Sequence, residues 1–314
     1  MITRALRHAR PSFAALLALV LAGLPSPSQA RDTLTWLLRD FPPLTIFSGP
    51  QAGLGAIDRL MPLLIARMPE YDHELMKVNR ARGMQMLQDP HQFVCDPTLL
   101  WTDERASIIL YSIPVYATQG NGVTLRRADL ARYADYIDQG EIDLAGVLSR
   151  GEIKVGIVAE RSYGPVIDNI LRQTTTHALN VHYGNDAVGS LLAMQRMGRL
   201  QAVLGYSPET RFQAQYRGMD PDELVFLRVK GTPKYQFAHI GCSNTAQGRQ
   251  AMEIINREMR TLRQNELVKL YAEWLTPDQR ADYLKDAQAF FDEAGHGEWA
   301  KETPSSGETA RGKP

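Results

Sequence analysis

Apolar and polar positions follow two periodicities along the chain, and together they predict alternating strands and helices. Thr33–Leu38 alternates as a short strand that Phe41-Pro42-Pro43 ends, and apolar residues then recur at helical spacing from Ile57 to Leu64. Pro62 is expected to kink or shorten that helix. Further elements are expected at 80–87 (helix), 92–95 (strand) and 108–111 (strand). This βαβ order indicates a mainly parallel sheet covered by helices.

A second series of elements begins at Gly122. A strand at 122–126 precedes a polar stretch at 130–148, which is predicted to be helical. The segment 152–158 is a predicted buried strand, and the helix after it is expected to be capped by Ser162, with Pro165 in its first turn. The remaining expected elements are helices at 187–197 (with Gly198 as its C-cap), 254–262 and 267–274, and strands at 200–205, 225–229 and 235–240.

This order predicts two α/β lobes, the second inserted into the first. Lobe 1 is expected to comprise residues 31–116 and 225–294, and lobe 2 residues 117–224. The polar tail 295–314, rich in Ser, Gly and Pro, is expected to be disordered. A cleft between two lobes is a preferred place for a small ligand.

The first 30 residues have the features of a cleaved signal peptide. Arg4, Arg7 and Arg10 precede the apolar stretch Phe13–Leu24, and Ser28-Gln29-Ala30 resembles a cleavage site. The apolar stretch is too short to span a bilayer, although a single membrane anchor is the alternative. Since no cysteine lies near Ala30, a lipid anchor is not expected. We therefore expect a soluble protein, cleaved after Ala30 and located in the periplasm.

Charge and cysteine content narrow the function further. The 35 Lys+Arg balance the 35 Asp+Glu, and no basic tract is present, so nucleic acid is not an expected partner. Two cysteines, Cys95 and Cys242, flank the inserted lobe. In an oxidising compartment an isolated pair favours a disulfide over a metal site, with two buried free thiols as the alternative. Such a bond would place both cysteines in lobe 1.

The segment from Trp101 to Arg127 carries the main candidate for ligand binding. Thr102-Asp103-Glu104 leads into Arg105, followed by an apolar run and a Ser-Ile-Pro break. The planar guanidinium of arginine suits a carboxylate or phosphate held by two hydrogen bonds. The alternative is a surface arginine paired with Glu104.

Several segments, in this order, resemble the periplasmic solute-binding proteins of family 3, the polar-amino-acid type. Thr102–Ala106 and Ser112–Tyr116 are similar to the family's T-x-E-R-A…F-S-x-P-Y signature. Similarity also extends over the segments 155–164, 191–204 and 254–274, so it covers nearly the whole mature chain. The resemblance implies a type 2 periplasmic-binding fold, with two hinge crossings near 116–122 and 205–226.

The resemblance also implies a binding site. Arg105, with Thr102, would hold the ligand's α-carboxylate. Donors would come from a helix N-terminus in lobe 2, where backbone N–H groups and the helix dipole favour an anion. Phe41 would either stack on the ligand or pack within its lobe, and Ser162 would either contact the ligand or only cap the helix. The expected ligand-binding residues are Arg105, Thr102, Ser162, Tyr163, Gly164, Phe41 and Tyr206.

This chain departs from the family at the ammonium end of the site. Tyr206 stands where amino-acid binders place an acid, Gln201 replaces an earlier acid, and Leu100 replaces a small residue. Glu209 would be either a substitute acid or a solvated loop residue. We therefore expect a small carboxylate-bearing anion as the ligand, and not an unmodified amino acid.

The leading hypothesis is a monomeric solute-binding protein for an ABC-type transporter or a sensor, without a cofactor, a metal or catalytic residues. A second hypothesis is an enzyme on the same scaffold, similar to cyclohexadienyl dehydratase. Against it, the seven histidines show no pairing and no catalytic motif is present. A third is a sensory or interaction module without a tight ligand, which would use the polar stretch 127–150 as a docking surface.

Overall fold

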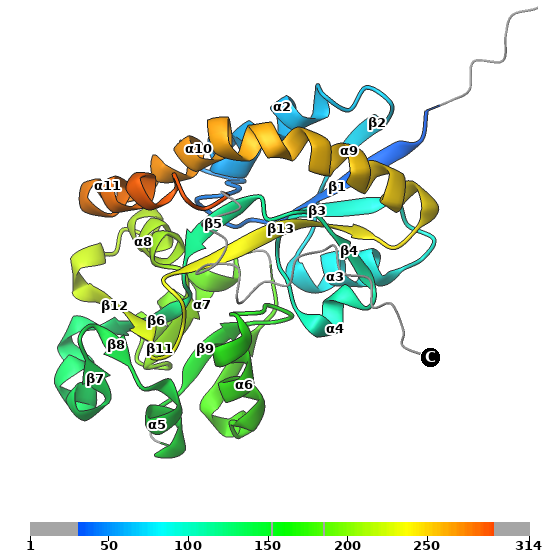
Figure 1. The fold of residues 1–314 in the computed structure, drawn as a ribbon. Coiled ribbons are helices and arrows are strands. Elements are labelled where there is room, and N and C mark those ends of the chain that lie inside the picture. The colour runs from blue at the N-terminus through cyan, green and yellow to red at the C-terminus, as the bar shows by residue number, and fades with distance from the viewer. Residues whose placement is uncertain (1–30, 152, 185, 292–314) are drawn as a thin grey trace, which may run out of the picture. The chain divides into compact units, whose positions relative to one another are not determined.

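Two β-sheets, each covered by helices, make up the computed structural model (Figure 1). It describes residues 31–151, 153–184 and 186–291, so the predicted signal peptide and tail lie outside the described residues. Within the described part, no helix is long and apolar enough to cross a membrane. Both sheets belong to one compact unit that begins at Thr33.

The first sheet has the strand order β2-β1-β3-β13-β4, and β5 also pairs with β13. Its strands are β1 (Thr33–Leu38), β2 (Asp72–Lys77), β3 (Val94–Leu100), β4 (Ile109–Tyr111), β5 (Tyr116–Gln119) and β13 (Tyr235–Ser243). Alternate residues of β1 face opposite sides, because Trp36 and Leu37 belong to different apolar clusters. These strands and the helices packed on them are called the first lobe below.

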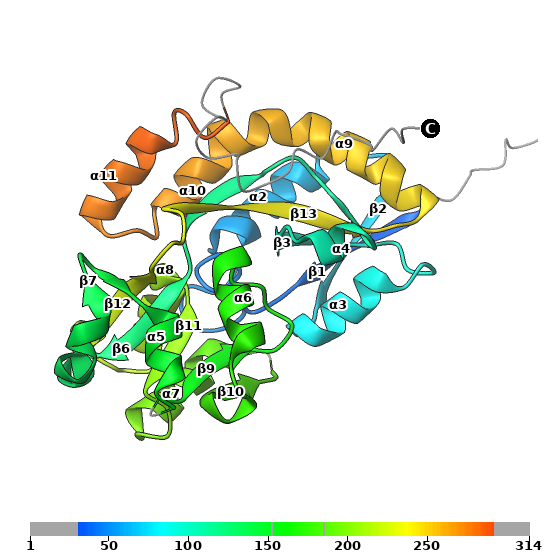
Figure 2. The same ribbon diagram turned by 60° about the horizontal axis from the view of Figure 1, so that its bottom comes forward.

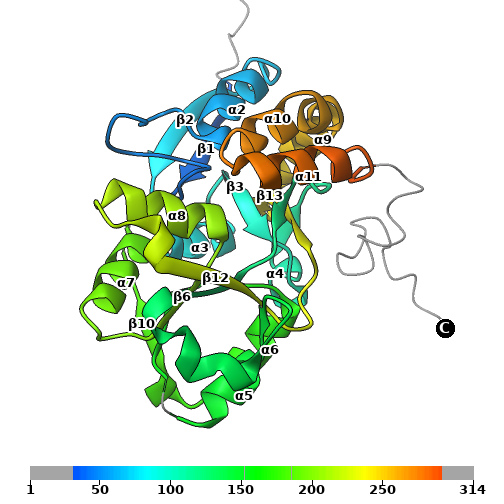
Figure 3. The ribbon, with the colours of Figure 1, turned by 90° about the vertical axis from the view of Figure 1, so that its left-hand side faces the viewer.

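Helices cover both faces of the first sheet (Figures 1 and 3). On the Trp36 face, Leu60 of α2 and Ile255 of α9 share a cluster with residues of α10 and α11. On the Leu37 face, Met84 of α3 fills the second cluster. The helices are α2 (Ala56–Ile65), α3 (Arg80–Gln88), α4 (Asp103–Ala106), α9 (Ala246–Leu262), the π-helical turn η4 (Arg263–Leu267), α10 (Val268–Ala272) and α11 (Pro277–Asp286).

The second sheet, with its helices, forms the second lobe (Figure 2). Its strand order is β10-β9-β11-β6-β12-β8-β7. The strands are β6 (Gly122–Arg126), β7 (Ile137–Asp138), β8 (Glu141–Ile142), β9 (Val155–Val158), β10 (Leu179–His182), β11 (Ala202–Gly205) and β12 (Leu224–Val229). The helices are α5 (Leu144–Ser149), α6 (Pro165–Gln173), α7 (Ala187–Arg196) and α8 (Ser207–Tyr216), with the 3₁₀ segments η1 (Arg127–Tyr136), η2 (Thr176–Ala178) and η3 (Pro221–Glu223).

The second lobe is inserted into the first, as the sequence predicted, but its bounds differ from the expected 117–224, because β5 belongs to the first sheet and β12 to the second. Every strand of the second sheet lies between β5 and β13, so the chain crosses from one lobe to the other after Gln119 and again after Val229. The expectation of a mainly parallel sheet was wrong, because both sheets are mixed. The strands next to the crossings, β6 and β13, run antiparallel to their neighbours β11, β12, β3, β4 and β5.

The prediction of a helix at 130–148 was also wrong. This stretch contains η1, the short antiparallel pair β7–β8 and the start of α5. Gln139 and Gly140, between the two strands, both have positive φ angles, 49° and 80°. That backbone conformation suits a tight hairpin turn and excludes a continuous helix.

Several elements were not predicted from the sequence. The strands β2 and β10 and the helices α8 and α11 were not predicted. Helix α2 runs through Pro62 and ends at Ile65.

The disulfide prediction is confirmed, since Cys95 and Cys242 are bonded. They lie on β3 and β13, which are neighbouring antiparallel strands of the first sheet, and they are paired in register. The bond therefore joins two segments of the first lobe that are 147 positions apart in the sequence.

His239, on β13, is expected to make stability depend on pH. Its buried ring Nδ1 lies 2.7 Å from the carbonyl oxygen of Ser112, which can only accept a hydrogen bond, so Nδ1 carries the proton. Nε2 is buried without a partner. Burial lowers the pKa of His239 to about 4, although the hydrogen bond to Ser112 opposes this.

The unfolded chain takes up a second imidazole proton near pH 6.5, and the folded chain does so only near pH 4. Stability therefore falls as the pH is lowered through this window. The expected loss is about 3 kcal/mol by pH 4, measured by urea unfolding. His239→Gln should remove that part of the pH dependence. An identical pH profile in the variant would refute this role for His239.

Candidate functional site

Arg105, the predicted anchor, lies on the short helix α4 at the edge of the first lobe. The hydroxyl of Thr102 caps this helix by accepting a hydrogen bond from the Arg105 amide at 3.2 Å. The Arg105 Nη2 donates to the backbone oxygen of Glu160 in the second lobe at 2.8 Å. Its Nη1 is buried without a hydrogen-bond partner. Arg105 therefore links the two lobes and keeps one free donor.

The N-terminus of α6, the predicted source of further donors, is filled by the chain's own carboxylate. Asp168 Oδ1 accepts a hydrogen bond from the Tyr163 amide at 2.7 Å, and Oδ2 accepts one from the Ser162 hydroxyl. The Gly164 amide donates to Ser162 Oγ at 3.2 Å. Pro165, the first helical residue, has no N–H. The predicted donors at this helix end, the Ser162 hydroxyl and the Tyr163 and Gly164 amides, are therefore already engaged within the chain.

Ser162 does not occupy the cap position that the sequence suggested. The N-cap residue of α6 is Gly164, whose φ of 97° favours glycine, so the helix begins two residues later than the Ser162 cap requires. Burial raises the pKa of Asp168, while its hydrogen bonds to Ser162 and Tyr163 lower it in part.

Tyr163 is a core residue of the second lobe. Its hydroxyl accepts a hydrogen bond from the Val158 amide at 2.7 Å, and its ring is fully buried. Burial raises the pKa of Tyr163 to about 12. Its backbone oxygen accepts hydrogen bonds from Asn121 and from Gln236 on β13. Its contacts are thus those of the fold.

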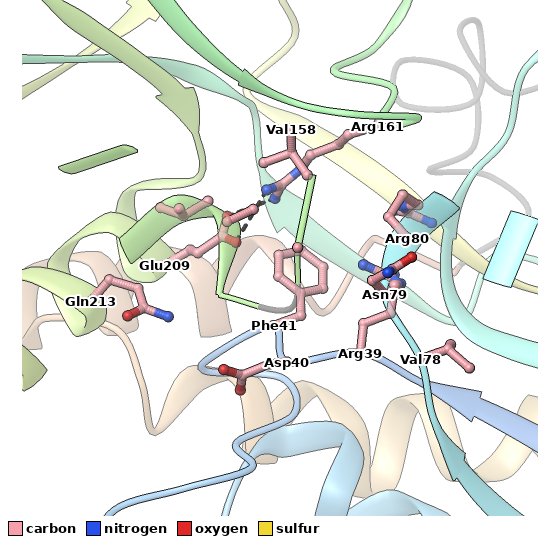
Figure 4. Close-up of a pocket in the computed structure, with 13 residues that line it drawn as sticks. Arg39, Asp40, Phe41, Val78, Asn79, Arg80, Val158, Arg161, Glu209 and Gln213 are labelled. Carbon is pink, nitrogen blue, oxygen red and sulfur yellow. Dashed lines mark hydrogen bonds and ion pairs between the residues drawn. The ribbon is translucent and has the colours of Figure 1, made fainter. Parts of the chain in front are cut away.

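The remaining two predicted residues, Phe41 and Tyr206, pack together around an arginine. Their ring centroids are 5.9 Å apart, and the guanidinium carbon of Arg161 lies 4.7 Å from the Phe41 centroid and 5.1 Å from that of Tyr206. Arg161 also forms a two-pronged ion pair with Glu209, at 3.1 and 2.6 Å (Figure 4). Phe41 thus packs against a cation of the other lobe.

The Arg161–Glu209 pair was not predicted. Glu209 was considered only as a substitute acid or a solvated residue, yet each of the two side chains is 5% exposed. Burial lowers the pKa of Arg161, but the attraction of Glu209 outweighs burial, so the pKa of Arg161 is raised. Arg161 therefore keeps its positive charge beside the Glu209 carboxylate.

A second arginine cluster lies in the first lobe, around Asp96. Arg39 donates from Nε to Asp96 Oδ2 at 3.2 Å and from Nη2 to the Thr98 backbone oxygen at 3.0 Å. Asp96 Oδ1 also accepts hydrogen bonds from the Thr98 amide and hydroxyl, both at 2.8 Å. Burial raises the pKa of Asp96, but the positive charges of Arg39 and Arg80 lower it by more, so the pKa of Asp96 lies below its ordinary value.

Arg80 is the least satisfied member of this cluster. Its Nη1 lies 3.7 Å from Asp96 Oδ2, which is too far for a hydrogen bond, and neither Nε nor Nη1 has a partner. Its side chain is 9% exposed. Burial, followed by the positive charge of Arg39, lowers the pKa of Arg80 well below its ordinary value, and Asp96 only partly opposes this.

A small polar cavity separates the two clusters. It has a volume of about 30 Å³, room for about two water molecules. Its charged lining consists of Arg39, Asp40, Arg80, Arg161 and Glu209, drawn from both lobes (Figure 4). A ligand larger than this requires the lobes or these side chains to move apart. Among the described residues, no group of three His, Cys, Asp or Glu side chains could hold a metal ion.

Comparison with known proteins shows similarity at the level of structure. The sequence matches no protein-family model and no curated protein. An amino acid ABC transporter substrate-binding protein of Streptococcus pneumoniae, bound to L-arginine, is similar with a TM-score of 0.58 and 16% identity, covering 82% of this chain and 95% of its own.

Two further structures have a TM-score of 0.60. One comes from work on glutathione import through the cystine ABC importer of Streptococcus mutans, with 12% identity, covering 80% of this chain and 100% of its own. The other is a histidine kinase sensor domain with similarity to periplasmic binding proteins, with 14% identity, covering 79% and 97%. At these identities the likeness concerns the fold alone: this chain has the two-lobed type 2 periplasmic-binding fold of substrate-binding proteins.

Proposed function

We propose that this chain is an extracytoplasmic solute-binding protein that encloses a small carboxylate-bearing anion between its lobes. It would serve an ABC-type transporter or a sensor. The observation that carries this proposal is the set of buried guanidinium donors without partners, Arg105 Nη1 and Arg80 Nε and Nη1. Burying such donors unpaired costs free energy, and a bound carboxylate would satisfy them with strong, charge-assisted hydrogen bonds.

The ligand is proposed to lack the α-ammonium group of an amino acid. An ammonium group needs a carboxylate partner, and Asp96 and Glu209 are both held by arginines. Asp40 lines the cavity too, but its carboxylate accepts the Phe47 amide and has Lys77 as a neighbouring cation. Tyr206, packed beside Arg161, offers no charge to an ammonium group.

A thermal-shift experiment with matched pairs of ligands tests this proposal. Propionate, 3-phenylpropionate and succinate would be compared with alanine, phenylalanine and aspartate. A carboxylate present at a hundredfold excess over its Kd is expected to raise Tm by about 5–10 °C. The amino acids should have smaller effects. Arg105→Gln is expected to reduce the shift, because it removes the charged donors.

Arg257→Gln is the matched control, since Arg257 is an exposed arginine on α9 that pairs with Glu258. It should respond as the wild type does. A shift that survives in Arg105→Gln would exclude Arg105 as the anchor. Equal shifts with the amino acids would exclude the ligand class. No shift with any carboxylate, together with no co-purified small molecule in native mass spectrometry, would overturn the proposal.

The proposed role includes no chemical step. Purified protein is therefore expected to leave prephenate and arogenate unchanged, as followed by absorbance and by chromatography of the products. Turnover of either compound would replace the binding role with an enzymatic one.

A further inference from the structure

Arg80 has the features of a ligand-binding arginine in a second position, apart from Arg105. We infer that it forms a second anionic subsite, so that the ligand carries two acidic groups, one for Arg105 and one for Arg80. This inference rests on the proposed function and narrows its ligand to the class of small diacids. The subsite lies wholly in the first lobe, formed by the start of α3 and supported by the residue after β1 and by β3.

Asp96 does not need Arg80 to satisfy its hydrogen bonds. Asp96 already receives the close hydrogen bond from Arg39 and two more from Thr98. Arg39, in turn, donates its hydrogen bonds to Asp96 and Thr98. Arg39 therefore acts as the structural partner of Asp96, and Arg80 adds a second positive charge to a pair that is already balanced.

The position of Arg80 at the start of α3 also indicates that this residue does not stabilise the fold. Arg80 is the first residue of α3, directly after the N-cap Asn79, and no acidic residue occupies the first turn. A cation at this end opposes the helix dipole, at a cost of about 0.3–1 kcal/mol. Residues that violate local rules in a buried position are expected at functional sites.

The side chain of Arg80 lines the cavity described above. Arg39, Arg80 and Arg161 line it together, and the guanidinium carbons of Arg39 and Arg161 both lie near the Phe41 ring, at 5.1 and 4.7 Å. Arg161 is neutralised by Glu209 and Arg39 by Asp96. Arg80 is therefore the cavity arginine that lacks a negative partner of its own.

Arg105 supplies the other subsite. Its positive charge helps to lower the pKa of Asp168 in the second lobe, but the hydrogen bonds of Asp168 go to Ser162 and Tyr163. Arg105 is close enough to Arg80 for its positive charge to contribute to the lowered pKa of Arg80. A single carboxylate would satisfy one of these guanidinium groups, whereas a diacid would satisfy both.

The first test compares acids of equal chain length with one or two carboxylates. Succinate, glutarate and adipate would be titrated against butyrate, pentanoate and hexanoate by calorimetry. At least one diacid is expected to bind about 10–100-fold more tightly than its monoacid. Arg80→Met should bring that diacid to the level of the monoacid. Methionine keeps the length and flexibility of the arginine stem.

The outcomes separate the inference from the proposed function. If monoacids and diacids bind the wild type equally, the inference is overturned and the proposed function stands. If diacid binding survives in Arg80→Met, Arg80 is not the second subsite. If no acid binds, the proposed function falls and the inference falls with it.

A second test needs no ligand. Because Arg80→Met removes a buried charge whose ion pair with Asp96 is long, at 3.7 Å, it is expected to raise the Tm of the ligand-free protein by about 2–4 °C. Arg39→Met should lower Tm, since it leaves Asp96 buried without its closest cation. If both variants lower Tm to a similar degree, Arg80 serves the fold and the inference is rejected.

Discussion

Replacing Arg161 with methionine is expected to lower the free energy of unfolding by about 3–5 kcal/mol. The substitution leaves Glu209 charged, 5% exposed, and without the guanidinium that now donates to both of its oxygens. The loss of contact with the Phe41 and Tyr206 rings adds to the effect. Urea unfolding followed by circular dichroism measures the change.

Two further variants make this prediction specific. The double variant Arg161→Met/Glu209→Leu removes both charges together. Its free energy of unfolding is expected to lie within about 1–2 kcal/mol of the wild-type value. Arg257→Met removes the arginine of the Arg257–Glu258 pair, whose side chain is 61% exposed. It should lower the free energy of unfolding by less than about 1 kcal/mol. A loss below 1 kcal/mol for Arg161→Met would mean that the pair is hydrated in solution.

The elements that bury an apolar face could be predicted from the sequence. In β1 and α9 the buried residues recur at the strand and helix periods, and tertiary packing agrees with that local pattern. The stretch 130–148 gave no single period, because its apolar residues fall into two groups on either side of Asp138-Gln139-Gly140-Glu141. Its backbone is determined instead by a turn at Gln139-Gly140 and by the parallel pairing of β8 with β12, over eighty residues later.

The site was predicted less well, because its ion pairs join residues far apart in the sequence. Arg161 and Glu209 are 48 positions apart, and Arg39 and Asp96 are 57 apart. Arg39 and Arg80 come together because β1 and β2 are parallel neighbours, with Leu38 opposite Lys77. Their carboxyl ends share one edge of the sheet, and an arginine follows each strand within three residues.

The missed strand β2 explains why this pair of arginines was overlooked. None of its six residues is buried, so it lacks the apolar alternation that identifies a half-buried strand. It is an edge strand, held mainly by the backbone pairing with β1. Because β2 was not predicted, the proximity of the loops that follow β1 and β2 could not be predicted either.

Breaking the disulfide is expected to lower the free energy of unfolding by about 4–5 kcal/mol in the chain-entropy model. The bond spans 147 positions and encloses the whole inserted lobe in one loop. Because β3 and β13 remain paired in register without it, the loss acts mainly through the unfolded chain, which becomes more extended. The denaturant dependence of unfolding should therefore also become steeper.

Urea unfolding of the wild type, with and without a thiol reductant, measures this effect. The variant Cys95→Ala/Cys242→Val should match the reduced wild type to within the cost of repacking two fully buried side chains, and it should not respond to reductant. Since the folded strands hold Cys95 and Cys242 side by side, the reduced protein should re-form the bond on oxidation. An unfolding midpoint that reductant leaves unchanged would show that the two thiols are free in solution.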